Sequence, residues 1–150
     1  MQIECREQNA VPVLMVRART AMKNLPQVIG ENYQKIMGYL TTLGEQPADA
    51  PYTCYHNMDM DDLDVEMGYP VGKALPGKGD ILAGEIPAGR YVTAMYTGPY
   101  TEMEKPYNEM FAWMKDKGYE LTGLYYEVYY NSPEEVPEEE LLTKIMLPVK

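Results

Sequence analysis

The sequence predicts an α+β domain built from two copies of a strand-helix-strand-strand unit. Two stretches carry apolar residues at helical spacing, and aromatic or β-branched runs of strand length flank each of them. Adding 74 to a residue number carries Tyr33 to Tyr107 and Tyr55 to Tyr129. The two halves therefore share an order of elements and a register, which indicates an internal duplication.

The first half is predicted as one helix with strands over residues 11–20, 52–57 and 63–71. Asn24 can cap the helix, Pro26 suits its first turn, and Gly44 ends it. Apolar residues between these signals repeat at helical spacing. They are Ile29, Tyr33, Ile36, Met37, Leu40 and Leu43.

The second half repeats this order after a connector rich in glycine and lysine at residues 72–79. Its strands are predicted over residues 80–87, 90–96, 123–130 and 141–149. Thr101 and Glu104 form a capping box for the second helix, which Gly118 ends. We therefore predict one domain over residues 1–150, with half-repeats at about 1–75 and 76–150.

Duplication has a geometric consequence for the two helices. They should lie on one face of a single sheet, related by an approximate two-fold axis, with a groove between them. Trp113 lies about 60° from Met110 on the second helix, beside its apolar stripe. Tyr39 holds the equivalent flank of the first helix. By symmetry both residues face the groove or both face away, and the core alternative for Trp113 stays open.

One charge, Glu127, interrupts the aromatic strand of the second half. Alternation places Tyr125, Glu127 and Tyr129 on one face of this strand. A buried carboxylate is costly without a partner, so a tyrosine hydroxyl, a proton or a cationic ligand should compensate it. The alternative is a glutamate exposed on an open sheet face. Glu127 aligns with Thr53, so the carboxylate is not duplicated.

Composition narrows the class of function. A net charge of −10 argues against direct nucleic-acid binding. No apolar run approaches the roughly 20 residues that span a bilayer, and the N-terminus lacks a secretory signal. Cys5 and Cys54 form no CxxC motif and suit a reducing compartment, so a cytoplasmic protein without membrane contact is expected.

Neither metal nor cofactor chemistry is expected from the motifs. His56 is the only histidine, and it has no Cys or His partner at ligand spacing, which argues against a zinc site. The sequence contains no nucleophile motif, which argues against a Ser-His-Asp triad. The prediction is therefore no metal and no cofactor.

The order of several short motifs resembles the GyrI-like small-molecule-binding domain, also called the effector-binding domain of bacterial transcription activators. The matching segments are Gly98–Tyr100, Trp113, Tyr126–Tyr129 with Asn131–Pro133, Thr143–Val149 and Val65–Val71. The resemblance spans nearly the whole chain and implies two strand-helix-strand-strand modules, termed SHS2, in one antiparallel sheet. No DNA-binding segment is present in this sequence, so the resemblance is to a stand-alone form of a domain that occurs in transcription regulators.

The resemblance implies a groove with a central glutamate that binds drugs and other small lipophilic or cationic molecules, as in multidrug binding. Glu127 matches that glutamate, and Trp113 matches a tryptophan that lines the groove. The residues predicted to bind ligand are Glu127, Trp113, Tyr125, Tyr69, Tyr39, Tyr129 and Met67. Sequestration or sensing of such a ligand is the first hypothesis.

Two alternatives use the same fold. Some family members resemble hydrolases of strained, cyclopropane-containing natural products, in which case Glu127 would be catalytic. The namesake of the family is a gyrase inhibitor, which implies a protein-interaction module with a protein partner.

Overall fold

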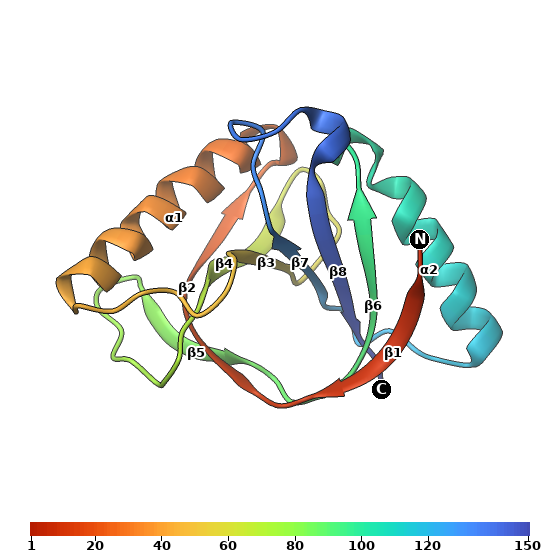
Figure 1. Cartoon of the computed structure of the whole chain (residues 1–150), viewed down its shortest axis with the longest axis horizontal. Helices are drawn as coiled ribbons and strands as arrows, with labels where there is room; N and C mark the ends of the chain where they lie inside the picture. The colour runs from red at the N-terminus through yellow and green to blue at the C-terminus, as the bar shows by residue number, and fades with distance from the viewer. The chain divides into compact units, whose positions relative to one another are not determined.

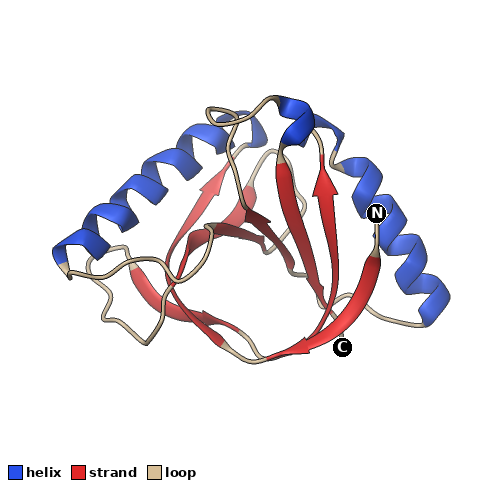
Figure 2. Ribbon diagram, in the orientation of Figure 1, coloured by secondary structure: helices blue, strands red, loops and turns tan.

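The computed structural model describes all 150 residues, and its packing divides the chain into two compact units. The α1 unit comprises Asn9–Ala88, and the α2 unit comprises Met1–Gln8 together with Gly89–Lys150. Each unit contains antiparallel strands and one long helix, blue in Figure 2. The predicted α+β class and the duplicated strand-helix-strand-strand order are confirmed.

The α1 unit holds strands β2 to β5 and helix α1, as labelled in Figure 1. Their bounds are β2 Val11–Thr20, β3 Tyr52–Tyr55, β4 Leu63–Pro70, β5 Leu82–Ile86 and α1 Leu25–Thr42, with a 3-10 turn η1 at Met22–Asn24. The strands pair in the order β3-β4-β2-β5. Alternate residues of β4, from Leu63 through Val65 to Met67, form a hydrophobic core with Ile36 and Leu40 of α1. The face of β4 that carries Glu66 therefore points away from α1.

The α2 unit repeats this plan. Its elements are β1 Ile3–Gln8, β6 Gly89–Thr97, α2 Glu104–Lys117, β7 Tyr125–Tyr129 and β8 Leu142–Pro148, with 3-10 turns η2 at Tyr100–Glu102 and η3 at Glu138–Glu140. The strands pair in the order β1-β6-β8-β7. Met110 and Met114 of α2 pack on Val92, Ile145 and Leu147. Ile145 lies opposite Glu127 in the register, so Glu127 shares the face that α2 covers.

One strand lies where the sequence analysis predicted none. β1, with the sequence IECREQ, pairs with β6 along its whole length. Its alternation is obscured because charged residues occur at Glu4, Arg6 and Glu7 and its apolar residues are few. β1 precedes β2 in the chain but belongs to the α2 unit, whereas β5 belongs to the α1 unit.

The helix ends agree with prediction, and so does the position at which α1 begins, but the start of α2 does not. Gly44 and Gly118 follow the two helices with positive φ angles of 71° and 80°, the conformation glycine adopts without strain. Asn24 is the N-cap residue of α1, as predicted, but its side chain makes no cap hydrogen bond. The capping box predicted at Thr101 is wrong, because α2 begins at Glu104 and its N-cap residue is Met103. Each helix is instead preceded by a 3-10 turn, and backbone carbonyls take up part of the N–H groups that a cap would satisfy. No helix is both long enough and apolar enough to cross a membrane.

Candidate functional site

Glu127 occupies the middle of β7, beneath α2. Its side chain extends from the strand face that packs on the helix, and only 8% of the residue is exposed. An ionised carboxylate in such a place must be hydrogen-bonded or paired. The sequence left open whether Glu127 is buried or exposed, and its position under α2 shows that it is buried.

Two tyrosine hydroxyls satisfy the carboxylate. Tyr107, on the first turns of α2, donates to Oε2 of Glu127 at 2.5 Å. Tyr129, two residues along β7, donates to Oε1 at 2.7 Å. Both are hydrogen bonds of the length expected when the acceptor is charged. Each carboxylate oxygen therefore has its own phenolic donor.

Further rings surround this group. The ring of Tyr100 meets that of Tyr129 edge-on at 5.7 Å between centroids. The ring of Tyr125 meets that of Tyr107 edge-on at 6.3 Å, and Phe111 lies 5.9 Å from Tyr107. Tyr100 is 39% exposed, so it forms the part of the shell that borders solvent. The site is a carboxylate in an aromatic cage, which we call the Glu127 cage: Glu127, Tyr100, Tyr107, Phe111, Tyr125 and Tyr129.

Burial sets the ionisation of this carboxyl. It raises the pKa of Glu127, and the hydrogen bonds from Tyr107 and Tyr129 oppose that rise without cancelling it. Burial, and then the nearby Glu127, raise the pKa of Tyr100 as well. The cage therefore disfavours negative charge, and a cation placed within it would relieve that penalty.

A second polar group lies on the same face of the sheet. Thr143 of β8 pairs with Tyr129 of β7 and with Tyr96 of β6 in the strand register. It is fully buried, and its Oγ1 has no hydrogen-bond partner in the chain. A buried hydroxyl of this kind is uncommon and marks a place where a small molecule or a water can bind. It stands one row along the sheet from Glu127.

The predicted wall residue Trp113 lies on another flank of α2. It is about 120° around the helix from Tyr107 at 3.6 residues per turn. Its indole stacks on Tyr119, with 5.8 Å between centroids and 10° between planes. Lys117 lies 6.0 Å above the indole. The structure thus places Trp113 in a stack with Tyr119, and its contact with a ligand stays a prediction.

The remaining predicted wall residues belong to the α1 unit. Met67 is fully buried under α1, where its sulfur accepts a hydrogen bond from Asn32 at 3.4 Å. Tyr69 is half-buried, with its ring 5.4 Å from that of Tyr33. The hydroxyl of Tyr39 donates to the carbonyl of Pro76 at 2.8 Å. Of the seven predicted residues, the structure brings Glu127, Tyr125 and Tyr129 together in the cage.

The two units differ at the positions equivalent to Tyr107 and Glu127. Tyr33 of α1 is the counterpart of Tyr107, but its hydroxyl donates at 2.8 Å to the backbone carbonyl of Tyr52. The position equivalent to Glu127 is Thr53, which is fully buried. The helix tyrosine is present in both units, whereas the acid is present in one. The buried carboxylate at this position is therefore present only in the α2 unit.

Sequence reasoning missed the hydrogen-bond donor on the helix and the orphan hydroxyl. The repeat aligns Tyr107 with Tyr33 of the apolar stripe, which agrees with its place on the sheet-facing side of α2, but the sequence analysis gave its hydroxyl no partner. The signal was available in part, because a tyrosine on a sheet-facing stripe needs a partner for its hydroxyl and the adjacent strand carries one carboxylate. Thr143 gave no signal, since its lack of a partner is visible only in three dimensions.

The family follows from a comparison with known domains. A family model described as the GyrI-like small molecule binding domain matches residues 1–150. The chain belongs to this family. The resemblance inferred from the motifs is thereby confirmed over the whole length of the GyrI-like domain. No curated protein matches the chain.

Several solved structures share the fold of this GyrI-like domain. The C-terminal domain of EcmrR is 23% identical with a TM-score of 0.82, over 99% of this chain and 97% of that one. A hydrolase from Listeria innocua is 15% identical with a TM-score of 0.74, over 99% and 92% of the two chains. SAV2435, solved bound to tetraphenylphosphonium, is 10% identical with a TM-score of 0.64, over 100% and 94%. The chain spans 57% of the EcmrR chain solved in a complex with DNA. At these identities the similarity establishes the fold.

Proposed function

We propose that this GyrI-like domain binds a small lipophilic cation in the Glu127 cage, in order to sense or sequester it. The observation that carries the proposal is the arrangement of Glu127 itself: a carboxylate 8% exposed, with a tyrosine on each oxygen and further rings around it. Aromatic faces attract cations by about 0.5–2 kcal/mol each. An acid among them adds a full charge.

Both parts of the ligand's chemistry follow from the cage. Its rings offer apolar surface, which favours a lipophilic body. Its buried acid favours a positive centre, because the pKa of Glu127 is raised by burial and a cation makes the ionised form less costly. Thr143 adds a hydroxyl that a polar substituent of the ligand could reach. SAV2435, which has this fold, binds a lipophilic cation, and this supports the proposal by analogy.

Access to Glu127 requires movement of the cage. A shallow hollow in the α2 unit is lined by Phe111, Met114, Lys115, Tyr119 and Leu121, and Glu127 does not line it. Tyr100 is the exposed ring at the edge of the cage, on a 3-10 turn after Gly98. We expect a ligand to displace Tyr100 first and then to bring its positive centre within about 6 Å of the rings of Tyr107 and Tyr129.

Hydrolysis is the second candidate function. The specific observation in its favour is that burial raises the pKa of Glu127, which favours the protonated carboxyl that a general acid requires. The two phenols could then hold a reacting molecule against the carboxyl. A binding measurement does not separate binding from turnover, so each compound that binds is also recovered from the protein and its mass is measured by mass spectrometry.

The test uses two ions of the same shape and opposite charge, tetraphenylphosphonium and tetraphenylborate. Binding of each is measured by calorimetry for the wild type, for Glu127→Gln, and for Glu109→Gln, which removes an exposed charge from α2. At about 5–7 Å and an effective dielectric constant of about 20, one charge pair is worth about 2–3 kcal/mol. Glu127→Gln should therefore weaken phosphonium binding roughly 30- to 150-fold.

The matched pair makes the result decisive. We expect the wild type and Glu109→Gln to bind phosphonium and to bind borate much more weakly, and Glu127→Gln to lose this preference. Equal phosphonium affinity in the wild type and Glu127→Gln would show that the cage is not the site. No binding of either ion would favour the protein-interaction alternative, and a recovered compound heavier by one water would favour hydrolysis.

A further inference from the structure

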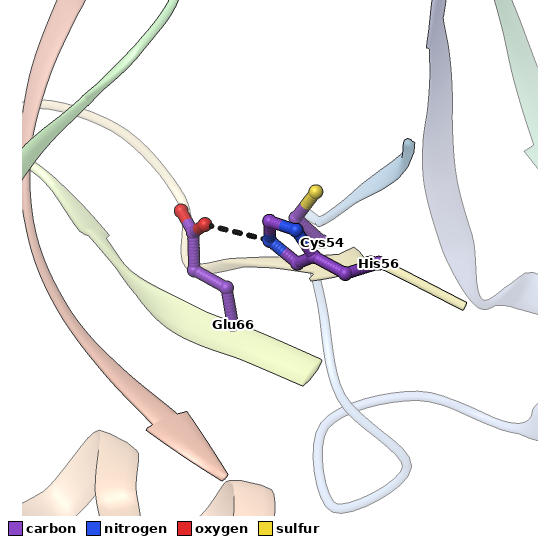
Figure 3. A group of neighbouring side chains, drawn as sticks. All are labelled: Cys54, His56 and Glu66. Carbon is purple, nitrogen blue, oxygen red and sulfur yellow. Dashed lines mark hydrogen bonds and ion pairs between the residues drawn. The ribbon is translucent and has the colours of Figure 1, made fainter. Parts of the chain in front are cut away.

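The α1 unit contains a second buried acid, and its neighbours are metal ligands. Cys54, His56 and Glu66 lie close together on β3, the loop after it and β4, as Figure 3 shows. One candidate ligand atom from each of them lies within 4.8 Å of the other two. Cys54 is fully buried and Glu66 is 5% exposed. We propose that these three side chains bind a zinc ion, a site separate from the Glu127 cage and independent of the function proposed for it.

Strand geometry explains why the three residues converge. Cys54 and His56 are two residues apart, so they share the face of the strand that points away from α1. Glu66 is the direct cross-strand partner of Cys54 in the antiparallel register. Side chains at such positions have Cβ atoms about 4.5–5.5 Å apart. Antiparallel pairing thus gathers a thiol, an imidazole and a carboxylate without any loop having to fold over them.

The distances suit a tetrahedral ion. His56 Nε2 and Glu66 Oε1 are 3.1 Å apart. Two ligands at about 2.0–2.1 Å from a tetrahedral zinc are separated by about 3.3 Å, and a thiolate at about 2.3 Å lies slightly farther away. Sγ of Cys54 lies within 4.8 Å of a ligand atom of each of the other two residues. On binding, the Cys54 thiol releases its proton to water, and the Sγ lone pair forms the bond to zinc.

The surroundings support an ion of this class. Tyr52, also on β3, donates its hydroxyl to Oε2 of Glu66, which orients the carboxylate and leaves Oε1 directed at His56. Orientation of a ligand by such a partner is usual in metal sites. The set of thiolate, imidazole and carboxylate matches zinc rather than magnesium or calcium. The His56 side chain is 23% exposed, so a fourth position remains for water or a small molecule.

Nearby charge would favour capture of a cation. The acidic turn that leads into β4 carries Asp59, Asp61, Asp62 and Asp64. The backbone N–H of His56 donates to the Asp64 carbonyl at 2.8 Å, which brings this turn beside the cluster. Arg17 and Arg19 pair with two of these aspartates, and the chain as a whole carries a net charge of −10. Long-range attraction would therefore raise the local concentration of a divalent ion.

The prediction of no metal rested on the absence of a Cys or His partner for His56 at ligand spacing. A Cys-x-His pair on one strand supplies two ligands, and the third comes from the neighbouring strand. Without an ion, the same three residues with Tyr52 could form only a hydrogen-bonded polar network. That is the outcome against which the test must discriminate.

The experiment uses cobalt(II) as a visible probe of a zinc site. Chelator-treated protein in a phosphine reductant is titrated with cobalt(II), and then with zinc(II) to displace it. We expect one ion per chain, a thiolate-to-cobalt charge-transfer band, and the intense visible bands of four-coordinate cobalt. Cys54→Ser should abolish the charge-transfer band, whereas Cys5→Ser, which changes the other cysteine, should leave it unchanged. Tyr52→Phe should weaken zinc binding roughly 10- to 100-fold while keeping the band.

Two results would overturn the proposal. One is a charge-transfer band that survives in Cys54→Ser, and the other is wild-type protein that binds no stoichiometric ion. Folding of each variant is checked by circular dichroism. If Cys54→Ser does not fold, the wild type still decides the matter, because His56 is the only histidine. Its ring nitrogen NMR signals must shift with one equivalent of zinc, and unchanged signals would refute the site.

Discussion

Removal of the Tyr107 hydroxyl tests the core of the Glu127 cage directly. In Tyr107→Phe the ring remains, and only the 2.5 Å hydrogen bond to Glu127 is lost. A hydrogen bond to a charged group is worth about 1.5–3 kcal/mol, against about 0.5–1.5 kcal/mol for one between neutral groups. We expect the free energy of unfolding to fall by about 1.5–3 kcal/mol where Glu127 is ionised.

The duplication supplies a matched control. Tyr33→Phe removes the equivalent hydroxyl of α1, whose acceptor is the neutral backbone carbonyl of Tyr52. Its cost should be about 0.5–1.5 kcal/mol, with little dependence on pH. The cost of Tyr107→Phe should increase with pH. The lost hydrogen bond favoured the ionised form, so its removal raises the pKa of Glu127 further above its ordinary value.

Urea denaturation at about pH 4.5 and about pH 8 measures both effects. A double-mutant cycle with Glu127→Gln then isolates the pair, and we expect a coupling energy of about 1–2 kcal/mol between the two positions. A coupling near zero would refute the assignment of Tyr107 as the donor to a charged Glu127. So would equal and pH-independent losses in Tyr107→Phe and Tyr33→Phe.

Three further predictions follow from other contacts. The pKa of Glu127 is raised in the folded state, so the carboxyl stabilises the fold fully at low pH, and this contribution is lost as pH rises through the folded-state pKa. In urea titrations the wild type should therefore lose stability relative to Glu127→Gln from about pH 4.5 upward. In Gly68→Ala the new Cβ would lie 2.1 Å from a backbone carbonyl oxygen of β2, which should lower the free energy of unfolding by about 1–3 kcal/mol or more. In Gly84→Ala the new Cβ meets a flexible methionine side chain at 3.2 Å, so the free energy of unfolding should change by under about 1 kcal/mol. Equal losses in the two variants would contradict this reasoning. Arg17→Met breaks a 2.7 Å ion pair with Asp64 on a partly exposed surface, so it should cost about 0–1 kcal/mol, and less in high salt.

The order of elements could be predicted because it is recorded locally. The spacing of apolar residues and the glycines after each helix locate α1 and α2, and the aromatic run locates β7. β1 could not be found in this way, because half of its residues are charged and its partner, β6, lies more than 80 residues away in the chain. The 3-10 turns before the helices were missed because cap residues and turn residues are the same types of residue.

The candidate site was predictable only as far as alternation reaches. Alternation placed Glu127 with Tyr125 and Tyr129, and this grouping is present in the structure. It could not supply Tyr107, because the distance from a helix to a strand depends on how the helix packs. Alternation also gave no reason to single out Glu66, since a polar residue between apolar ones in a strand is ordinarily assigned to the solvent face. In the structure Glu66 is only 5% exposed.

The two buried glutamates show how donors select chemistry on a duplicated framework. Glu127 lies on the face covered by its helix, and its donors are both phenols, which are uncharged in their protonated form. Glu66 lies on the face turned away from its helix, beside an imidazole and a thiol. A phenol-lined acid suits an organic cation, whose charge is spread and whose body is apolar. An acid beside sulfur and nitrogen suits a small ion that can bond to all three. The same backbone plan is therefore compatible with a site for an organic cation and with a site for a metal ion. The side chains next to the glutamate, two residues along its strand or opposite it on the neighbouring strand, determine which ligand suits the site.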